Sequence, residues 1–94
     1  MPLKRLIRLN RFVRAFDDLD ADIQKIAEKQ FHFFIENPFH PSLHTEKIDK
    51  AKGIYASRIT DNVRFTWQFG EEKSTVVLRN VGEHNKVLKR KGGK

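Results

Sequence analysis

The segment Val63–Phe69 (VRFTWQF) alternates large apolar and polar residues along its whole length. Such alternation is typical of a β-strand with one buried and one wetter face, because successive side chains point to opposite sides of a sheet. Two further strand-like segments flank it, Ile54–Thr60 (IYASRIT) and Ser74–Val81 (STVVLRNV). The pattern therefore predicts three consecutive antiparallel strands joined by short loops.

Burial decides the register of the first predicted hairpin. A two-residue loop, Asp61-Asn62, would place Arg58 on the same face as Phe65. A three-residue loop that begins at Thr60 instead pairs Arg58 with Arg64 on the opposite face. A one-residue slip exchanges the two faces of a strand. We expect the three-residue loop, because it keeps the apolar side chains together.

The second predicted hairpin extends this positive charge into a row. A four-residue loop over Gly70–Lys73 would place Phe65 opposite Leu78 and Arg64 opposite Arg79. Three arginines would then lie side by side across roughly 10 Å, since neighbouring strands are about 4.8 Å apart. Like charges that face each other repel, so the row indicates a bound anion such as phosphate. The alternative is an ordinary solvated sheet face with local acidic partners.

The first half of the chain predicts a short strand followed by two helices. Leu3–Leu9 is expected to be an edge strand, and Asn10 to cap a helix that ends near Leu19. Asp20 is expected to cap a second helix, which ends at Asn37-Pro38 because the residue before proline disfavours helical geometry. The expected apolar faces consist of Phe12, Val13 and Phe16 in the first helix and of Ile23, Ile26, Ala27, Phe31, Phe34 and Ile35 in the second.

The remaining segments complete the predicted fold. Phe39–Gly53 (FHPSLHTEKIDKAKG) is expected to be a polar connection with at most one helical turn. The order β-α-α-β-β-β then predicts a single α+β domain over residues 1–94. Its two helices would cover one face of a small antiparallel sheet, and the arginines would lie on the other face. Residues 90–94 are expected to form a flexible basic tail.

Charge is unevenly distributed along a chain whose net charge is +7. Met1–Phe16 carries five basic residues and no acidic one, whereas Asp17–Glu36 carries six acidic residues and two lysines. Val81–Lys94 carries five basic residues and one acidic one. This balance predicts an anionic partner. Because there is no cysteine and no apolar stretch long enough to span a bilayer, we expect a cytoplasmic protein without metal, cofactor or membrane contact.

Four sequence segments, taken in their order along the chain, carry a resemblance to a known protein family. They are ENPFHPSL at the end of the second helix, the lysine-containing TEKIDKAKG, the hairpin YASRITDNVRFTW and the terminal VGEHNKVLKR. Together, and in this order, they resemble the RelE/ParE family of toxins from bacterial toxin–antitoxin pairs. The resemblance implies a metal-independent endoribonuclease that cuts mRNA on the ribosome, represses translation and is silenced by an acidic antitoxin. It implies a monomeric toxin or a toxin–antitoxin hetero-oligomer.

Two other functions are compatible with the same resemblance. One is ParE-like inhibition of DNA gyrase without nuclease chemistry. The other is a non-toxic interaction protein that retains the fold. Growth arrest on expression would separate the third function from the first two, and mRNA cleavage would separate the first from the second.

The resemblance also assigns roles to individual residues. His84 matches the histidine of the family's G-x-H motif, and Arg58 and Arg64 match its hairpin arginines. Metal-free RNA cleavage needs a proton acceptor, a proton donor and positive charge around the phosphate, which histidine and arginine supply. We expect His84 to be the acid or the base, and His44 to be the second proton carrier. The expected RNA-binding residues are Arg79, Lys47, Lys50, Lys52, Lys86, Lys89 and Arg90.

One position departs from the family pattern. After the motif valine the family usually has Tyr, sometimes Phe, and this chain has Leu88. Leucine cannot stack on a base as an aromatic ring does, and it has no hydroxyl group to hold a phosphate or pass a proton. Any cleavage would therefore depend on the histidines and arginines.

Overall fold

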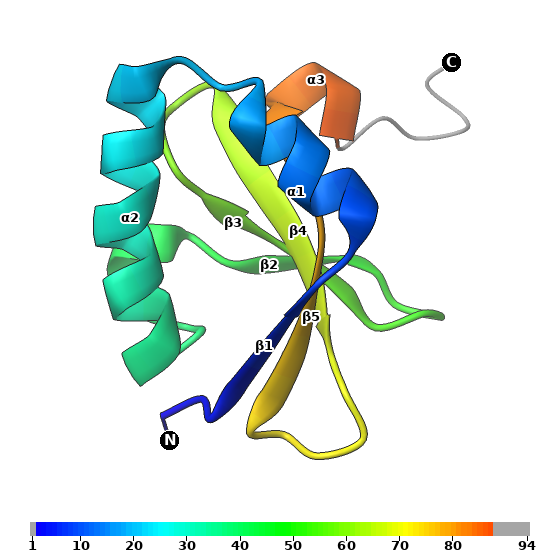
Figure 1. The fold of residues 1–94 in the computed structure, drawn as a ribbon. Helices are drawn as coiled ribbons and strands as arrows, with labels where there is room; N and C mark the ends of the chain where they lie inside the picture. The colour runs from blue at the N-terminus through cyan, green and yellow to red at the C-terminus, as the bar shows by residue number, and fades with distance from the viewer. Residues whose placement is uncertain (1, 88–94) are drawn as a thin grey trace.

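The sheet holds one strand more than the sequence pattern predicts. A computed structural model describes residues 2–87 and shows a five-stranded sheet within them (Figure 1). Its elements are β1 (Arg5–Arg8), α1 (Asn10–Asp17), α2 (Ala21–Glu36), the 3-10 turn η1 (Pro41–Leu43), β2 (Glu46–Asp49), β3 (Ile54–Arg58), β4 (Val63–Phe69), β5 (Thr75–Glu83) and α3 (His84–Val87). None of the helices described is long and apolar enough to cross a membrane.

The strand order is β1-β5-β4-β3-β2. The α+β class and the two helices on one face are confirmed, but the sheet is mixed, because β1 runs parallel to β5. The chain reaches β5 only after both helices and three other strands, which allows this parallel return. The sequence pattern missed β2 within the predicted polar connection. Its four residues, EKID, are mostly charged, as is common for a short edge strand, so they show little apolar alternation.

The two helices bury narrower stripes than predicted. In α1 the N-cap is Leu9 rather than Asn10, and the helix ends at Asp17. Phe12 and Phe16 face the core as expected, whereas Val13 is 41% exposed. The buried stripe follows Phe12, Ala15, Phe16 and Leu19, a spacing of three to four residues that leaves Val13 at its edge.

The second helix begins and ends as predicted. Asp20 is its N-cap, although its side chain forms no capping hydrogen bond, and Asn37 leaves the helix in an extended conformation. Ile26 and Ile35 are exposed, contrary to expectation. Gln30 is buried instead, on the stripe that the helix turns toward the sheet.

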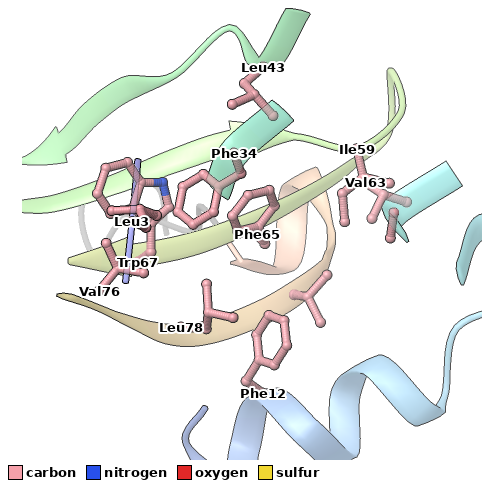
Figure 2. Packing of buried hydrophobic residues seen from close by; sticks show 12 residues of the cluster. Leu3, Phe12, Phe34, Leu43, Ile59, Val63, Phe65, Trp67, Val76 and Leu78 are labelled. Atoms are coloured by element: carbon pink, nitrogen blue, oxygen red, sulfur yellow. The ribbon is translucent and has the colours of Figure 1, made fainter. Parts of the chain in front are cut away.

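Aromatic side chains form the centre of the core (Figure 2). Phe34 of α2 contacts Phe65 and Trp67 of β4 edge-on, with ring centroids 5.1 and 5.0 Å apart. All three side chains are fully buried. The alternation along β4 therefore points its aromatic residues at the helices, and its polar residues face the other side of the sheet.

A chain of buried polar groups closes the core beside Trp67. The Trp67 Nε1–H donates to Ser57 Oγ at 2.9 Å, and Ser57 Oγ lies 2.7 Å from Thr45 Oγ1. Thr45 in turn donates to the carbonyl of Pro38 at 2.7 Å. Since the Thr45 proton is used there, the Ser57 hydroxyl donates to Thr45. The chain links β4, β3 and the segments on either side of η1.

We expect Ser57→Ala to lower the free energy of unfolding by about 1–3 kcal/mol, because it leaves the buried Trp67 N–H without an acceptor. Denaturation followed by the fluorescence of Trp67, the single tryptophan, measures the change. Ser74→Ala, at a half-buried loop position, is the matched control. Equal stability of the two variants would contradict the expectation.

Candidate anion site at the β3–β4 turn

The turn between β3 and β4 sets Arg58 directly opposite Arg64. The Ile59 N–H donates to the Val63 carbonyl at 2.9 Å, and the Thr60 hydroxyl accepts from the Val63 N–H at 3.2 Å. The predicted three-residue loop and the predicted pairing are therefore confirmed. Phe65 and Trp67 of β4 point toward the helices. Because side chains alternate along a strand, Arg64 and its partner Arg58 lie on the opposite face of the sheet.

Arg64 holds the turn together. Its Nη1 donates to the carbonyl oxygens of Thr60, Asp61 and Val63, at 2.6, 3.0 and 3.3 Å. Burial lowers the pKa of Arg64 below its ordinary value, and the nearby charge of Arg58 lowers it further, whereas Asp61 and Glu46 act in the opposite direction. A bound anion would act against this lowering, because a nearby negative charge favours the charged form of Arg64.

Arg58 has hydrogen-bonding capacity to spare. Its Nε is buried and has no hydrogen-bond partner among the residues described. Its Nη1 lies 3.7 Å from the Asp61 carboxylate, whose side chain is 92% exposed. A pair of this kind, long and open to water, is weak. An anion that entered between the two arginines would give the Arg58 Nε–H the acceptor that the described residues do not supply.

The predicted third member of the row is elsewhere. Arg64 pairs with Gly82 of β5, not with Arg79, and the register shifts between Thr66 and Trp67. Arg79 donates through Nη1 to Gln68 Oε1 at 2.5 Å, further along β4. The predicted pairing of Phe65 with Leu78 is also wrong. The actual pairs are Phe65 with Val81, Trp67 with Leu78 and Phe69 with Val76.

The physical reason is a longer loop combined with this irregularity in the ladder. Phe69 pairs with Val76, so the loop is longer than the predicted Gly70–Lys73. The irregularity lets Val76, Leu78 and Val81 all enter the core although their spacing departs from strict alternation. The row of three arginines is therefore a pair, with Gly82 of β5 opposite Arg64.

His84 reaches the same turn from the other side. Its backbone N–H donates to the Asn62 carbonyl at 2.6 Å, directly after β5 ends. Its exposed side chain lines a polar hollow of about 360 Å³ together with Asp61, Asn62 and Glu83. Asp61 is thus the common neighbour of Arg58 and His84. The turn brings a histidine, two arginines and two carboxylates to one end of the sheet.

His44 lies at this end of the sheet as well. It follows η1 in a left-handed conformation, with φ 47° and ψ 47°, and its side chain is exposed. Glu46 pairs with Ala56 and Thr45 contacts Ser57, so the chain at His44 comes level with Arg58. His40, by contrast, accepts from the Ser42 N–H at 3.1 Å and stacks on Phe33, which indicates a packing role.

The other predicted RNA-binding residues are spread around the molecule. Lys47 pairs with Tyr55 and lies over its ring, on the face opposite Arg58. Lys50 and Lys52 are exposed at the turn between β2 and β3, at the far end of β3 from Arg58. Lys86 belongs to α3. The remaining predicted positions, Leu88, Lys89, Arg90 and the tail at 90–94, lie outside the described residues.

Sequence reasoning missed Gln30. Its side-chain Nε2 donates to the Arg58 carbonyl at 2.9 Å and to the Ser42 carbonyl at 3.2 Å. The Gln30 amide of α2 is therefore hydrogen-bonded both to the end of β3, which carries Arg58, and to the turn that precedes His44. The available signal was a polar residue on the apolar stripe of the second helix.

We expect Gln30→Met to loosen this end of the sheet, because it keeps a similar side-chain volume but leaves two carbonyl groups without a donor. The Ile59 amide should exchange its hydrogen faster, since it closes the turn directly after Arg58. Gln24→Met is the matched control, because Gln24 also donates to a carbonyl, that of Phe16, away from this turn. Equal Ile59 exchange rates in the two variants would contradict the expectation.

Comparison with known proteins bears on the fold. No protein-family model matches the chain, and no curated protein matches its sequence. A YoeB/ParE toxin from Agrobacterium tumefaciens superposes with a TM-score of 0.73 at 15% identity, covering 86% of this chain and 99% of that one. RelE in the archaeal RelE–RelB complex from Pyrococcus horikoshii OT3 gives 0.70 at 12% identity, with 88% and 96% covered. The isolated E. coli RelE toxin gives 0.66 at 18% identity, with 88% and 84% covered.

The chain has the RelE/ParE fold. In this chain the RelE/ParE fold gathers guanidinium and imidazole groups at the β3–β4 turn. Residues 2–87 hold no cluster of three side chains suited to bind a metal ion. The groups that are present can bind an anion and exchange a proton with it.

Proposed function

We propose that this chain is the toxin of a toxin–antitoxin pair and that it cleaves mRNA on the ribosome in the cytoplasm. The observation that carries the proposal is the pairing of Arg58 with Arg64, in which the buried Arg58 Nε has no partner within residues 2–87. The likeness in fold to the RelE and YoeB/ParE toxins supports membership of the same superfamily.

The proposed reaction uses the RNA's own 2′-hydroxyl group. The 2′-oxygen loses its proton and attacks the adjacent phosphorus, and the bond to the 5′-oxygen of the next nucleotide breaks as that oxygen takes up a proton. Arg58 and Arg64 stabilise the charge that builds up on the non-bridging oxygens. In this proposal His84 carries one of the two protons, and His44 carries the second.

An acidic antitoxin is the proposed protein partner. Several of the similar solved structures are toxin–antitoxin complexes, among them RelB–RelE from Methanococcus jannaschii. The net charge of +7 and the two edge strands β1 and β2 offer an acidic, extended peptide both attraction and backbone hydrogen bonds. The proposed species are the free monomeric toxin and a hetero-oligomer with this antitoxin.

Expression without an antitoxin tests the proposal. We expect growth arrest, and primer extension on translated mRNA should show new 5′ ends that depend on the ribosome. Intact mRNA in arrested cells would overturn the nuclease proposal. Harmless expression of folded protein would instead indicate an interaction protein that is not a toxin.

Leu88 favours one alternative, ParE-like inhibition of DNA gyrase without nuclease chemistry, because the position lacks the usual aromatic side chain. A supercoiling assay with purified gyrase distinguishes the two. Loss of supercoiling with intact mRNA would support the alternative, and full supercoiling with cut mRNA would support the nuclease.

A further inference from the structure

A group of aromatic rings reaches the surface at the far end of the sheet from the β3–β4 turn. Phe39, between α2 and η1, is 50% exposed, more than any other large apolar side chain described. Its ring centroid lies 5.5 Å from that of Tyr55 and 6.3 Å from that of Phe69. The Tyr55 and Phe69 rings lie 5.9 Å apart, so the three rings form one continuous surface.

Two lysines lie over this surface. The Lys47 ammonium group lies 5.3 Å from the centroid of the Tyr55 ring, and that of Lys73 lies 5.8 Å from the centroid of Phe69. Neither forms an ion pair with a described carboxylate, although Glu71 and Glu72 precede Lys73 in the exposed loop. We refer to Phe39, Tyr55, Phe69, Lys47 and Lys73 as the aromatic–lysine patch.

Hydrogen bonds fix the backbone that carries the exposed ring. The Phe39 N–H donates to Asn37 Oδ1 at 2.9 Å, and the next residue, His40, donates to the Asn37 carbonyl at 2.9 Å. Trp67, stacked on the inner side of Tyr55 at 4.6 Å, is already fully buried. Phe39 therefore gives the patch a fixed, half-exposed aromatic side chain beyond the closed core.

We propose that the aromatic–lysine patch binds single-stranded nucleic acid, with bases stacked on the rings and the two ammonium groups on the phosphates. Aromatic rings bordered by cations suit such strands, because every base has a face to stack and every linkage carries a charge. The ammonium groups rest on the rings in the free protein, and both can move to a phosphate when a base takes their place.

This inference rests on the proposed function, since it assigns the patch to nucleotides that flank the cleaved ones. β2 is the edge strand next to β3, and its residues alternate between the two faces of the sheet. Lys47 faces the rings, whereas Glu46 pairs with Ala56 on the face of Arg58. An RNA chain that is held by Arg58 on β3 therefore needs to pass around β2 alone to reach Tyr55 on the other face.

Fluorescence anisotropy with a labelled, unstructured 12-nucleotide RNA tests the patch in the free protein. We expect Phe39→Ala to weaken binding about tenfold, from the loss of one stacked base. Lys47→Gln and Lys73→Gln should each lower the slope of log affinity against log salt by about one, as loss of a phosphate contact does. Phe39→Leu, which keeps an apolar side chain without a ring, should weaken binding as Phe39→Ala does.

The controls match the substitutions in kind but lie on α2, away from the patch. Ile26→Ala removes another exposed apolar side chain, and Lys25→Gln removes another exposed lysine. Wild-type RNA affinity in both Phe39 variants would overturn the inference. So would a loss of affinity confined to an acidic antitoxin peptide, which would assign the patch to a protein partner. A matching single-stranded DNA probe shows whether the 2′-hydroxyl contributes.

Failure of the inference and failure of the proposed function are distinguishable. RNA binding that depends on Phe39 in a protein that cuts no mRNA would retain the patch and reject the nuclease. Ribosome-dependent cleavage by a protein whose RNA affinity is unchanged by substitutions at Phe39, Lys47 and Lys73 would support the nuclease and reject the patch.

Discussion

Replacing Arg58 with glutamine is expected to lower ribosome-dependent mRNA cleavage about 100- to 1000-fold, the usual effect of removing one donor to a developing negative charge. Of the two arginines, Arg58 is the better one to substitute, because its contacts contribute less to the stability of the fold. Its Nε has no partner in the part of the chain that the structure describes, and its contact with the exposed Asp61 is long and weak. The substitution therefore removes a donor meant for the phosphate while costing the fold little.

Arg64→Gln should behave differently. The Arg64 side chain donates to three carbonyl groups of the turn, so its loss should lower both cleavage and the free energy of unfolding. Arg79→Gln is the matched control, because Arg79 donates to Gln68 further along the sheet. Cleavage rates come from primer extension, and stability from denaturant titration. Equal cleavage by the Arg58→Gln and Arg79→Gln proteins would contradict the assignment of the anion site.

The sequence was sufficient to predict strand faces and pairing where buried and exposed residues alternate strictly. Along β4 every second residue is large and apolar, so the faces of β3 and β4 were determined, and the pairing of Arg58 with Arg64 followed. It was insufficient where the ladder is irregular. The register shift opposite Thr66 moves Arg79 away from Arg64, and alternation alone gives no sign of such a shift.

The remaining differences arise from contacts that are distant in the sequence. Lys47 was expected to bind RNA, but its face could not be predicted because β2 was not recognised. Gln30 contacts Arg58, 28 residues away, through a single side-chain hydrogen bond. Local hydrophobic patterns predict which residues are buried, but they do not predict which distant carbonyl group a buried amide will bond.

His84→Gln is expected to lower cleavage about 100- to 10,000-fold, the range for loss of a general acid or base. Glutamine retains polarity and similar reach but cannot accept and release a proton near neutral pH. The backbone N–H that fixes this position on Asn62 is unaffected, so the turn and the pairing of Arg58 with Arg64 should remain intact. A loss of rate without a loss of stability would then report proton transfer.

The pH dependence of cleavage assigns the role. If His84 accepts the 2′-proton, the wild-type rate rises with pH, and the variant loses that rise. If His84 donates to the leaving oxygen, the variant loses the fall at higher pH instead. His32→Gln, at an exposed position on α2, is the control and should leave the profile unchanged. A His84→Gln protein with the wild-type rate and profile would remove His84 from the mechanism, and loss of both in His44→Gln would transfer the role to the residue on the other side of Arg58.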